Sequence, residues 1–225
     1  MLRRIVKILK KLPLDFGQYE LRYTTKGKLI AYELAEDGAG KKALDAGCRD
    51  GYWSEKLKQK GYEVIAFDLE TSYPGALTVD ANRRLPFADN EFDLIWCAEV
   101  IEHLLDPAFT IAEFKRVLKP DGVLLMTTPN QGFWVFRALE QLGISMTRIQ
   151  NEDHHYFFTY QEIQRLAGAC DFYGYFPYLL LKFRIRRGAS MLSPTIVLRH
   201  REDRRAAAAA GVHRRPAVVG SGAPA

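Results

Sequence analysis

The stretch Ala43-Leu44-Asp45-Ala46-Gly47-Cys48-Arg49-Asp50-Gly51 decides how this chain can fold. A short apolar run ends here in an acidic residue, a turn with two glycines follows, and a helical pattern begins at Tyr52. In a parallel α/β sheet, the crevice beyond the carboxyl end of such a strand is where a nucleotide-like ligand binds. Gly47 and Gly51 allow the backbone to turn tightly and to approach a ligand closely. We therefore predict a nucleotide-type site at this turn.

The glycine spacing excludes two common nucleotide sites. A dinucleotide fingerprint that starts at Gly47 needs two further glycines, but the chain has Arg49 and Tyr52 at those positions. No Lys-Ser/Thr pair follows the turn, so it is not a phosphate-binding P-loop. What remains is an acidic strand end, a Gly-x-x-x-Gly turn, and a second acidic residue, Asp68, at the end of the next apolar run.

Apolar runs alternate with helical patterns along most of the chain. Strands are predicted at 42–45, 62–67, 77–79, 92–97, 123–127, 173–183 and 195–198, and helices at 26–37, 52–60, 107–118 and 159–169. A capping box at Thr159 and Glu162 opens the last of these helices. Alternation of this kind produces right-handed crossovers. The predicted fold class is therefore α/β, with a Rossmann-like seven-stranded mainly parallel sheet and helices on both faces.

The basic residues are concentrated at the two ends of the chain. The formal net charge is +5, yet residues 1–12 hold five basic residues and no acid, and residues 199–225 hold six arginines against two acids. The middle of the chain is consequently acidic, which disfavours a nucleic-acid partner. We expect one domain at 26–200, a basic amphipathic helix and linker at 1–25, and a disordered Arg/Ala-rich tail at 201–225.

The first twelve residues have an amphipathic pattern. Leu2, Ile5, Leu9 and Leu12 recur at helical spacing, with basic residues on the other face. This pattern is typical of a helix on an anionic membrane surface, or of one packed over the domain. No apolar run reaches the roughly 18 residues of a membrane-spanning helix. The three widely spaced cysteines indicate buried thiols, so we expect a cytoplasmic protein, with peripheral contact at the inner membrane face as an open alternative.

Five motifs, taken in chain order, resemble those of the class I S-adenosylmethionine-dependent methyltransferases, and most closely the type 11, small-molecule branch. They are Leu44-Asp-Ala-Gly-Cys-Arg-Asp-Gly51, Val64-Ile-Ala-Phe-Asp68, Asp80-Ala81 with the following Leu85-Pro-Phe87 and Phe92-Asp-Leu-Ile95, Glu99-Val-Ile-Glu-His-Leu104, and Leu118-Lys-Pro-Asp-Gly122. Each motif is common, whereas the ordered set is specific and covers roughly residues 40–200. Family members usually have glycine where Arg49 stands.

The resemblance implies that S-adenosylmethionine is the cofactor. Asp68 would accept both ribose hydroxyls, Asp80 would accept the adenine amino group, and Leu69 would pack on the adenine ring. Asp45 would either orient the turn or touch the ligand, and a strand-end aspartate is also often a helix cap. The predicted cofactor-binding residues are Asp45, Gly47, Cys48, Arg49, Gly51, Asp68, Leu69, Asp80, Ala81, Cys97 and Glu99.

Methyl transfer needs alignment of the acceptor, and needs a base only where the acceptor must lose a proton. His103 and His155 are the predicted catalytic residues, because histidine titrates near neutral pH. The aromatic-rich segment 130–158 is predicted to be an acceptor-side insertion or lid, in which Asn130, Trp134 and His154 bind substrate. No metal centre is expected.

The expected function is methylation of an oxygen on a small or lipid-linked acceptor. The alternative is a non-catalytic S-adenosylmethionine-binding module that serves as a partner-binding protein. Arg49 is the residue that favours this alternative, since a long side chain in the turn would narrow a cofactor pocket.

Overall fold

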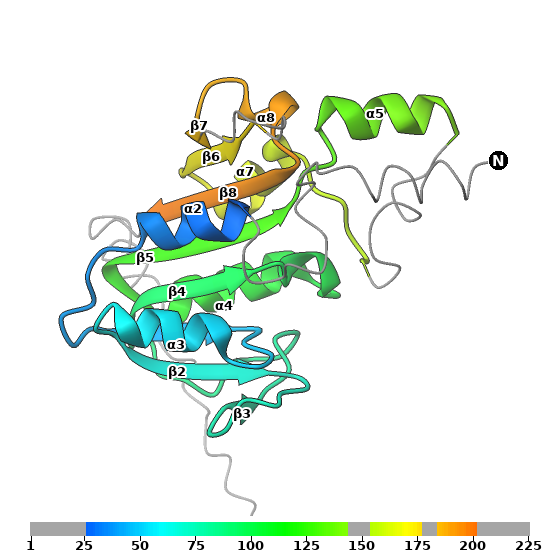
Figure 1. Cartoon of the computed structure of the whole chain (residues 1–225). Coiled ribbons are helices and arrows are strands. Elements are labelled where there is room, and N and C mark those ends of the chain that lie inside the picture. The colour runs from blue at the N-terminus through cyan, green and yellow to red at the C-terminus, as the bar shows by residue number, and fades with distance from the viewer. Residues whose placement is uncertain (1–25, 144–153, 177–183, 202–225) are drawn as a thin grey trace, which may run out of the picture.

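The computed structural model describes residues 26–143, 154–176 and 184–201 of the 225-residue chain. Within these residues the strands form one eight-stranded sheet in the order β3-β2-β1-β4-β5-β8-β6-β7 (Figure 1). The strands are β1 (Lys42–Ala46), β2 (Glu63–Asp68), β3 (Leu77–Thr78), β4 (Phe92–Ala98), β5 (Leu118–Pro129), β6 (Asp171–Tyr175), β7 (Arg184–Ile185) and β8 (Thr195–Arg201). The helices are α2 (Lys26–Leu34), α3 (Tyr52–Gln59), η1 (Ile101–His103), α4 (Pro107–Val117), α5 (Trp134–Gln141), α7 (Tyr160–Ala167) and α8 (Ala189–Leu192).

The predicted α/β class with a mainly parallel sheet is confirmed. β3, β2, β1, β4 and β5 pair in parallel, while β8 pairs antiparallel with both β5 and β6. The sheet has one strand more than predicted, because Arg184 and Ile185 pair with Tyr175 and Gly174 at its edge. Two residues are too short to give a recognisable strand pattern in the sequence.

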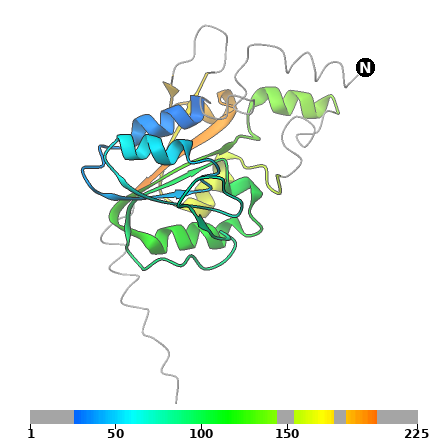
Figure 2. The same cartoon turned by 60° about the horizontal axis from the view of Figure 1, so that its bottom comes forward.

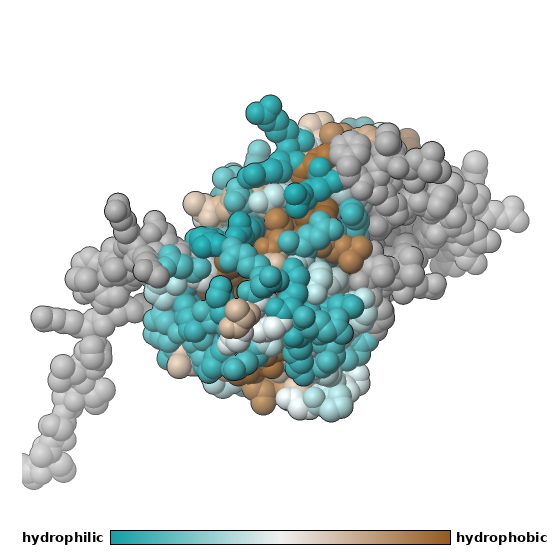
Figure 3. Space-filling view, turned by 60° about the vertical axis from the view of Figure 1, so that its left-hand side comes forward, coloured by the Kyte–Doolittle hydropathy of each residue, from teal (hydrophilic) through white to brown (hydrophobic). Residues whose placement is uncertain are grey.

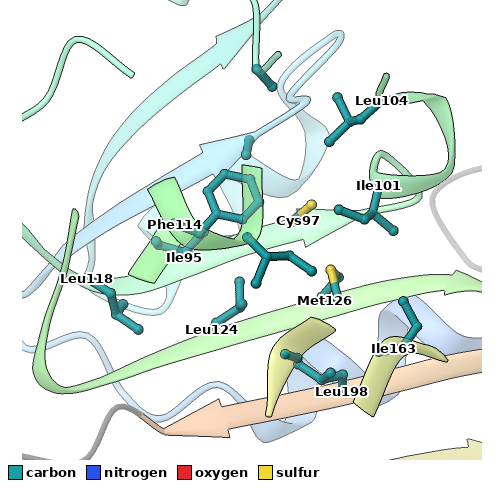
Figure 4. Packing of buried hydrophobic residues seen from close by; sticks show 14 of the residues in the cluster. Ile95, Cys97, Ile101, Leu104, Phe114, Leu118, Leu124, Met126, Ile163 and Leu198 are labelled. Atoms are coloured by element: carbon teal, nitrogen blue, oxygen red, sulfur yellow. The ribbon is translucent and has the colours of Figure 1, made fainter. Parts of the chain in front are cut away.

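Helices cover both faces of the sheet. Figure 2 shows α2 and α3, in blue and cyan, on one side and α4, in green, on the other. On the α2 and α3 side, Ile30, Trp53 and Leu57 pack against sheet residues such as Trp96. On the opposite side, the cluster in Figure 4 joins Phe114 of α4 and Ile163 of α7 to Ile95, Cys97, Leu124, Met126 and Leu198 of the sheet. Neighbouring β4 residues therefore alternate between two cores, as strands buried on both faces require.

Several element bounds differ from the sequence prediction. β5 begins at Leu118, so residues 119–122, between the predicted helix and the predicted strand, belong to this strand. The pairing of β5 with β4 is irregular there, with a register shift between Phe92 and Leu94. Asp121 there has a φ of 66°, a left-handed backbone that short polar residues tolerate. β6 ends at Tyr175, and the remainder of the predicted strand at 177–183 lies outside the described residues.

The capping box of α7 is confirmed. The Thr159 side chain accepts from the Glu162 backbone N–H, and the Glu162 carboxylate accepts from the Thr159 backbone N–H at 2.8 Å. We expect Thr159→Ala to lower the free energy of unfolding by about 1 kcal/mol, since a helix N–H loses its partner. Urea unfolding measures this loss, with the exposed Gln161→Ala as the matched control in the same helix turn. Equal losses in the two variants would contradict a role for the cap.

The predicted amphipathic helix and linker at 1–25 and residues 202–225 of the predicted tail lie outside the described part of the chain. β8 runs to Arg201, one residue into the predicted tail. Among the described residues, no helix is both long and apolar enough to cross a bilayer.

The face near the amino ends of the parallel strands is mainly hydrophilic (Figure 3). A hollow lined by Ala169, Cys170, Asp171, Arg199 and Arg201 lies at the β6 and β8 part of the sheet.

Candidate active site

The turn after β1 lies where the strand order reverses. β1 has β2 on one side and β4 on the other, so the chain's crossovers leave it in opposite directions. The carboxyl ends of β2, β4 and β5 point to the same side of the molecule in Figure 1. A Cβ on Gly47 would overlap with the Val100 side chain, so the turns after β1 and β4 are in close contact. Gly47 also has a φ of 78°, which makes glycine the suitable residue on both counts.

Asp68 ends β2 beside this turn. Its Oδ2 accepts the Arg49 backbone N–H at 2.9 Å, and its Oδ1 accepts the Glu70 N–H at 3.3 Å. Leu69 follows with 60% of its surface exposed, as an apolar platform needs. The prediction that the second acidic strand end reaches the Gly-x-x-x-Gly turn is thus consistent with the geometry.

Arg49 has a φ of 52°, in the left-handed region that favours glycine, which is the residue the related motif usually has there. The Arg49 residue is exposed, so its side chain is not part of the packed core beneath the turn. Gly51 has a φ of 81°, and a Cβ there would overlap with the Tyr73 ring. The second glycine of the turn is therefore required by local packing as much as by any ligand.

Asp45 lies beneath α3, out of contact with solvent. It is 1% exposed, and its Oδ2 accepts from the Ser54 hydroxyl at 2.5 Å. Burial raises the pKa of Asp45 to about 7, and the nearby charge of Asp68 adds to the rise. Of the two roles left open for Asp45, the geometry supports orientation of the turn and α3. Ser54 was not singled out from the sequence, because a serine in a helix carries no distinguishing pattern.

The backbone donors of the turn are already in use. The N–H groups of Gly47 and Cys48 both donate to the Phe67 carbonyl, at 2.9 and 3.0 Å, and that of Arg49 donates to Asp68. The Gly51 N–H donates to the Cys48 carbonyl at 2.8 Å. A ligand at this turn would consequently meet oxygen acceptors rather than a nest of N–H donors.

Asp80 stands two residues beyond β3, and β3 pairs with the end of β2. Its Oδ1 accepts from both the backbone N–H and the side-chain amide of Asn82, each at 2.9 Å. The Asn82 N–H holds the pKa of Asp80 below its usual range, so this carboxylate is ionised at neutral pH. Ala81 is nearly buried, and its carbonyl accepts from the Thr110 hydroxyl at 2.9 Å.

Three predicted site residues have side chains that the fold uses elsewhere. The Cys97 thiol is fully buried in the core of Figure 4, so its side chain packs in the core, and cofactor binding by this residue stays a prediction. Cys48 is also buried, with its Sγ 3.6 Å from the Thr71 hydroxyl. Asn130 has no exposed surface and is a structural anchor, not an acceptor contact: its Nδ2 donates to the carbonyls of Ser190 and Ser193, and its Oδ1 accepts the Gly132 N–H.

Two carboxyl groups follow β4 on the side away from Asp68. Glu99 has a φ of 60°, and its Oε1 accepts from the Thr127 hydroxyl at 2.8 Å. Glu102 is 1% exposed, and its Oε2 accepts from the Thr128 hydroxyl at 3.1 Å. Burial raises the pKa of both, and the charge of Glu99 raises that of Glu102 further. Glu102 was missed at first, although a carboxylate directly after the apolar pair Val100-Ile101 is a signal that could have found it.

The histidines gather at the same place. The rings of His103 and His154 meet edge to face with centroids 4.6 Å apart. The backbone N–H groups of His155 and Tyr156 donate to the Glu102 carbonyl at 2.9 and 3.1 Å, while the His155 residue itself is exposed. The structure thus brings His103 and His154 together.

Trp134 opens α5 and keeps 44% of its surface exposed, whereas Phe133 and Phe136 bury one another with rings at 5.0 Å. Half of the aromatic segment therefore packs as core. The part of the predicted insertion at 144–153 lies outside the described residues.

Comparisons with known proteins agree with this arrangement. A family model described as a methyltransferase domain matches residues 17–174. The chain is 34% identical over 125 residues to the "Probable S-adenosylmethionine-dependent methyltransferase" of Mycolicibacterium smegmatis, covering 51% of this chain and 49% of that protein. It is 36% identical over 110 residues to a ubiquinone biosynthesis O-methyltransferase of Actinobacillus pleuropneumoniae, covering 41% and 47%. The chain spans about half the length of these curated relatives.

Among solved structures, a SAM-dependent methyltransferase from Archaeoglobus fulgidus has a TM-score of 0.58 at 17% identity. The match covers 79% of this chain and 92% of that chain, which shows a shared fold. The family model, for its part, spans well over half of the sequence and contains β1 to β5 together with the turn at Gly47. On this evidence, the chain belongs to the methyltransferase-domain family.

Proposed function

We propose that this chain is an S-adenosylmethionine-dependent methyltransferase that methylates an oxygen of a small acceptor. The observation that supports this most is the convergence, at one edge of the sheet, of Asp68 and Asp80 on one side of the Gly47 turn and of Glu102 and the histidines on the other. One half offers acceptors suited to a nucleoside, and the other offers titratable groups suited to an acceptor hydroxyl.

The groups near the turn fit the cofactor by their chemistry. Each Asp68 oxygen accepts one backbone N–H and has capacity for a ribose hydroxyl as well. The ionised Asp80 suits the adenine amino group, and the exposed Leu69 suits the face of the ring. Because the N–H donors of the turn are already used, its remaining oxygen acceptors suit an ammonium group. When bound, S-adenosylmethionine supplies a methyl group on a positively charged sulfur.

The acceptor side favours oxygen chemistry. A hydroxyl acceptor must lose a proton, and His103, which is half-buried, and His155, which is exposed, are the candidate bases. Trp134 provides exposed aromatic surface for a ring-bearing or lipid-linked acceptor. One relative is named as a ubiquinone biosynthesis O-methyltransferase, which agrees with a small acceptor methylated on oxygen. The relatives named as methyltransferases favour an enzyme over the non-catalytic alternative, which rests on Arg49.

Turnover tests the proposal directly. We expect the purified chain, incubated with S-adenosylmethionine and a panel of phenols, catechols and carboxylic acids, to release S-adenosylhomocysteine with at least one acceptor. Calorimetric titration with S-adenosylmethionine and with NAD provides the control for cofactor identity. Binding of NAD without S-adenosylmethionine would overturn the assignment. Binding of S-adenosylmethionine without product from any acceptor would instead favour the non-catalytic module.

A further inference from the structure

We propose that Glu102, His103 and His154 form a binding site for a divalent transition-metal ion. One ligand atom from each residue lies within 4.8 Å of those of the other two. Metal–ligand bonds of about 2.1 Å place neighbouring ligand atoms roughly 3 to 3.5 Å apart. Small side-chain rotations that bring these ligand atoms closer together would therefore let all three bind one ion. This proposal revises the expectation of no metal centre: the two segments that supply these residues are far apart in the chain, and the fold brings them together.

An unsatisfied oxygen supplies the second, independent observation. Glu102 is 1% exposed, and among the described residues its Oε1 has no hydrogen-bond partner, whereas Oε2 accepts from Thr128 at 3.1 Å. A buried polar atom without a partner costs stability, and one in a native fold calls for a ligand, an ion or a water. A cation between Glu102 and the two imidazoles would satisfy this oxygen.

The backbone holds the three ligands in place. η1 presents Glu102 and His103 in succession directly after β4. The segment that carries His154 is fastened to this turn by the hydrogen bonds from His155 and Tyr156 to the Glu102 carbonyl. The Tyr156 hydroxyl also donates to the Leu105 carbonyl at 3.0 Å. The contact between the His103 and His154 rings is therefore supported by hydrogen bonds to the carbonyls of Glu102 and Leu105, on either side of His103.

The donor set indicates the class of metal. Two imidazoles with one carboxylate suit Zn²⁺, Mn²⁺, Fe²⁺ or Co²⁺, whereas Mg²⁺ and Ca²⁺ prefer oxygen ligands throughout. Three protein ligands leave coordination positions open for water or for a substrate oxygen. In a second role, which rests on the proposed function, an acceptor hydroxyl bound there would lose its proton more readily. His103 would then act as a ligand rather than as a base.

Direct metal binding, measured without any methyl donor, tests the site. We expect the tag-free, chelator-treated full chain to bind one equivalent of Zn²⁺ by calorimetry, and Co²⁺ to give a visible absorption band that Zn²⁺ abolishes. Glu102→Gln, His103→Ala and His154→Ala should each weaken Zn²⁺ binding at least about tenfold. The control is His155→Ala, which removes the neighbouring exposed imidazole and should change the affinity less than about twofold.

Several outcomes would overturn the site. Wild-type protein that binds less than one equivalent of either metal would do so, as would three ligand variants that bind like wild type, or a His155→Ala variant as weak as His154→Ala. Thermal unfolding of each variant separates lost binding from lost folding, and His154, which is half-buried in a loop, keeps the test valid should Glu102→Gln fail to fold. The metal-binding assay contains no methyl donor, so its result does not depend on the proposed function. A chain that binds metal but transfers no methyl group would contradict the proposed function and would still support the metal site.

Discussion

Replacing Asp68 with alanine should weaken S-adenosylmethionine binding by about a hundredfold. The carboxylate is proposed to accept two ribose hydroxyls, and a hydrogen bond to a charged group contributes roughly 1.5 to 3 kcal/mol. The substitution also removes the acceptor of the Arg49 N–H, so the turn loses one of the bonds that hold it against β2. Isothermal titration calorimetry of the wild type and the variant measures the loss.

Two further variants separate the parts of this effect. Asp68→Asn keeps an oxygen that can accept the Arg49 N–H but loses the charge, so we expect an intermediate loss of about tenfold. Glu70→Ala removes an exposed carboxylate two residues away and should leave the affinity within about twofold. An Asp68→Ala variant that binds S-adenosylmethionine as tightly as wild type would remove this residue from the cofactor site.

Asp45 should make the protein less stable as the pH rises from 5 to 8. The unfolded chain ionises this residue near pH 4, whereas the folded chain keeps the proton up to a pKa of about 7. Between these values the folded state binds more protons, so raising the pH favours unfolding; below both values the residue contributes no pH dependence. The difference of roughly three pKa units corresponds to a total loss on the order of 4 kcal/mol between low pH and pH 8, of which about 2.5 kcal/mol falls between pH 5 and pH 8.

Asp45→Asn isolates this contribution. The amide keeps an oxygen for the Ser54 hydroxyl and cannot ionise, so the variant should lose less stability over the same pH range. Urea unfolding at pH 5, 6, 7 and 8 gives the difference between wild type and variant, in which the pH dependence of other buried carboxyls such as Glu99 and Glu102 cancels. Parallel stability curves for the two proteins would show that Asp45 does not retain its proton in the fold.

The proposed cofactor side of the site, around the Gly47 turn and Asp68, is the part whose local structure the sequence patterns predict well. A strand end, a glycine turn and a following helix are local, and their residues are adjacent in the chain. Gly47 and Gly51 both adopt the left-handed backbone that their spacing indicates, and Asp68 reaches the same turn through the pairing of β1 with β2. Even here, only packing shows that Asp45 is covered by α3 and held by Ser54.

The acceptor half depends on contacts between distant segments. Asn130 lies in an aromatic stretch that is typical of a substrate pocket, but its amide is consumed by carbonyls more than 50 residues away. Cys97 lies near the end of β4, where the sequence predicts a cofactor contact, but the alternation of side chains along the strand places its thiol in the core. No local pattern indicates either fact, because periodicity shows which residues share a face and not what covers that face.

The sequence by itself determined the α/β class, the parallel strands, the capped helix at Thr159 and the acidic strand end at the glycine turn, since each depends on residues within one or two turns of chain. Only the tertiary structure decided that Glu102 is buried with an unpaired oxygen, and that His154 lies against His103. The physical reason is that the 154–158 segment is attached to η1 by hydrogen bonds to the Glu102 backbone carbonyl. Every residue has a carbonyl, so no side-chain pattern in the sequence indicates this contact.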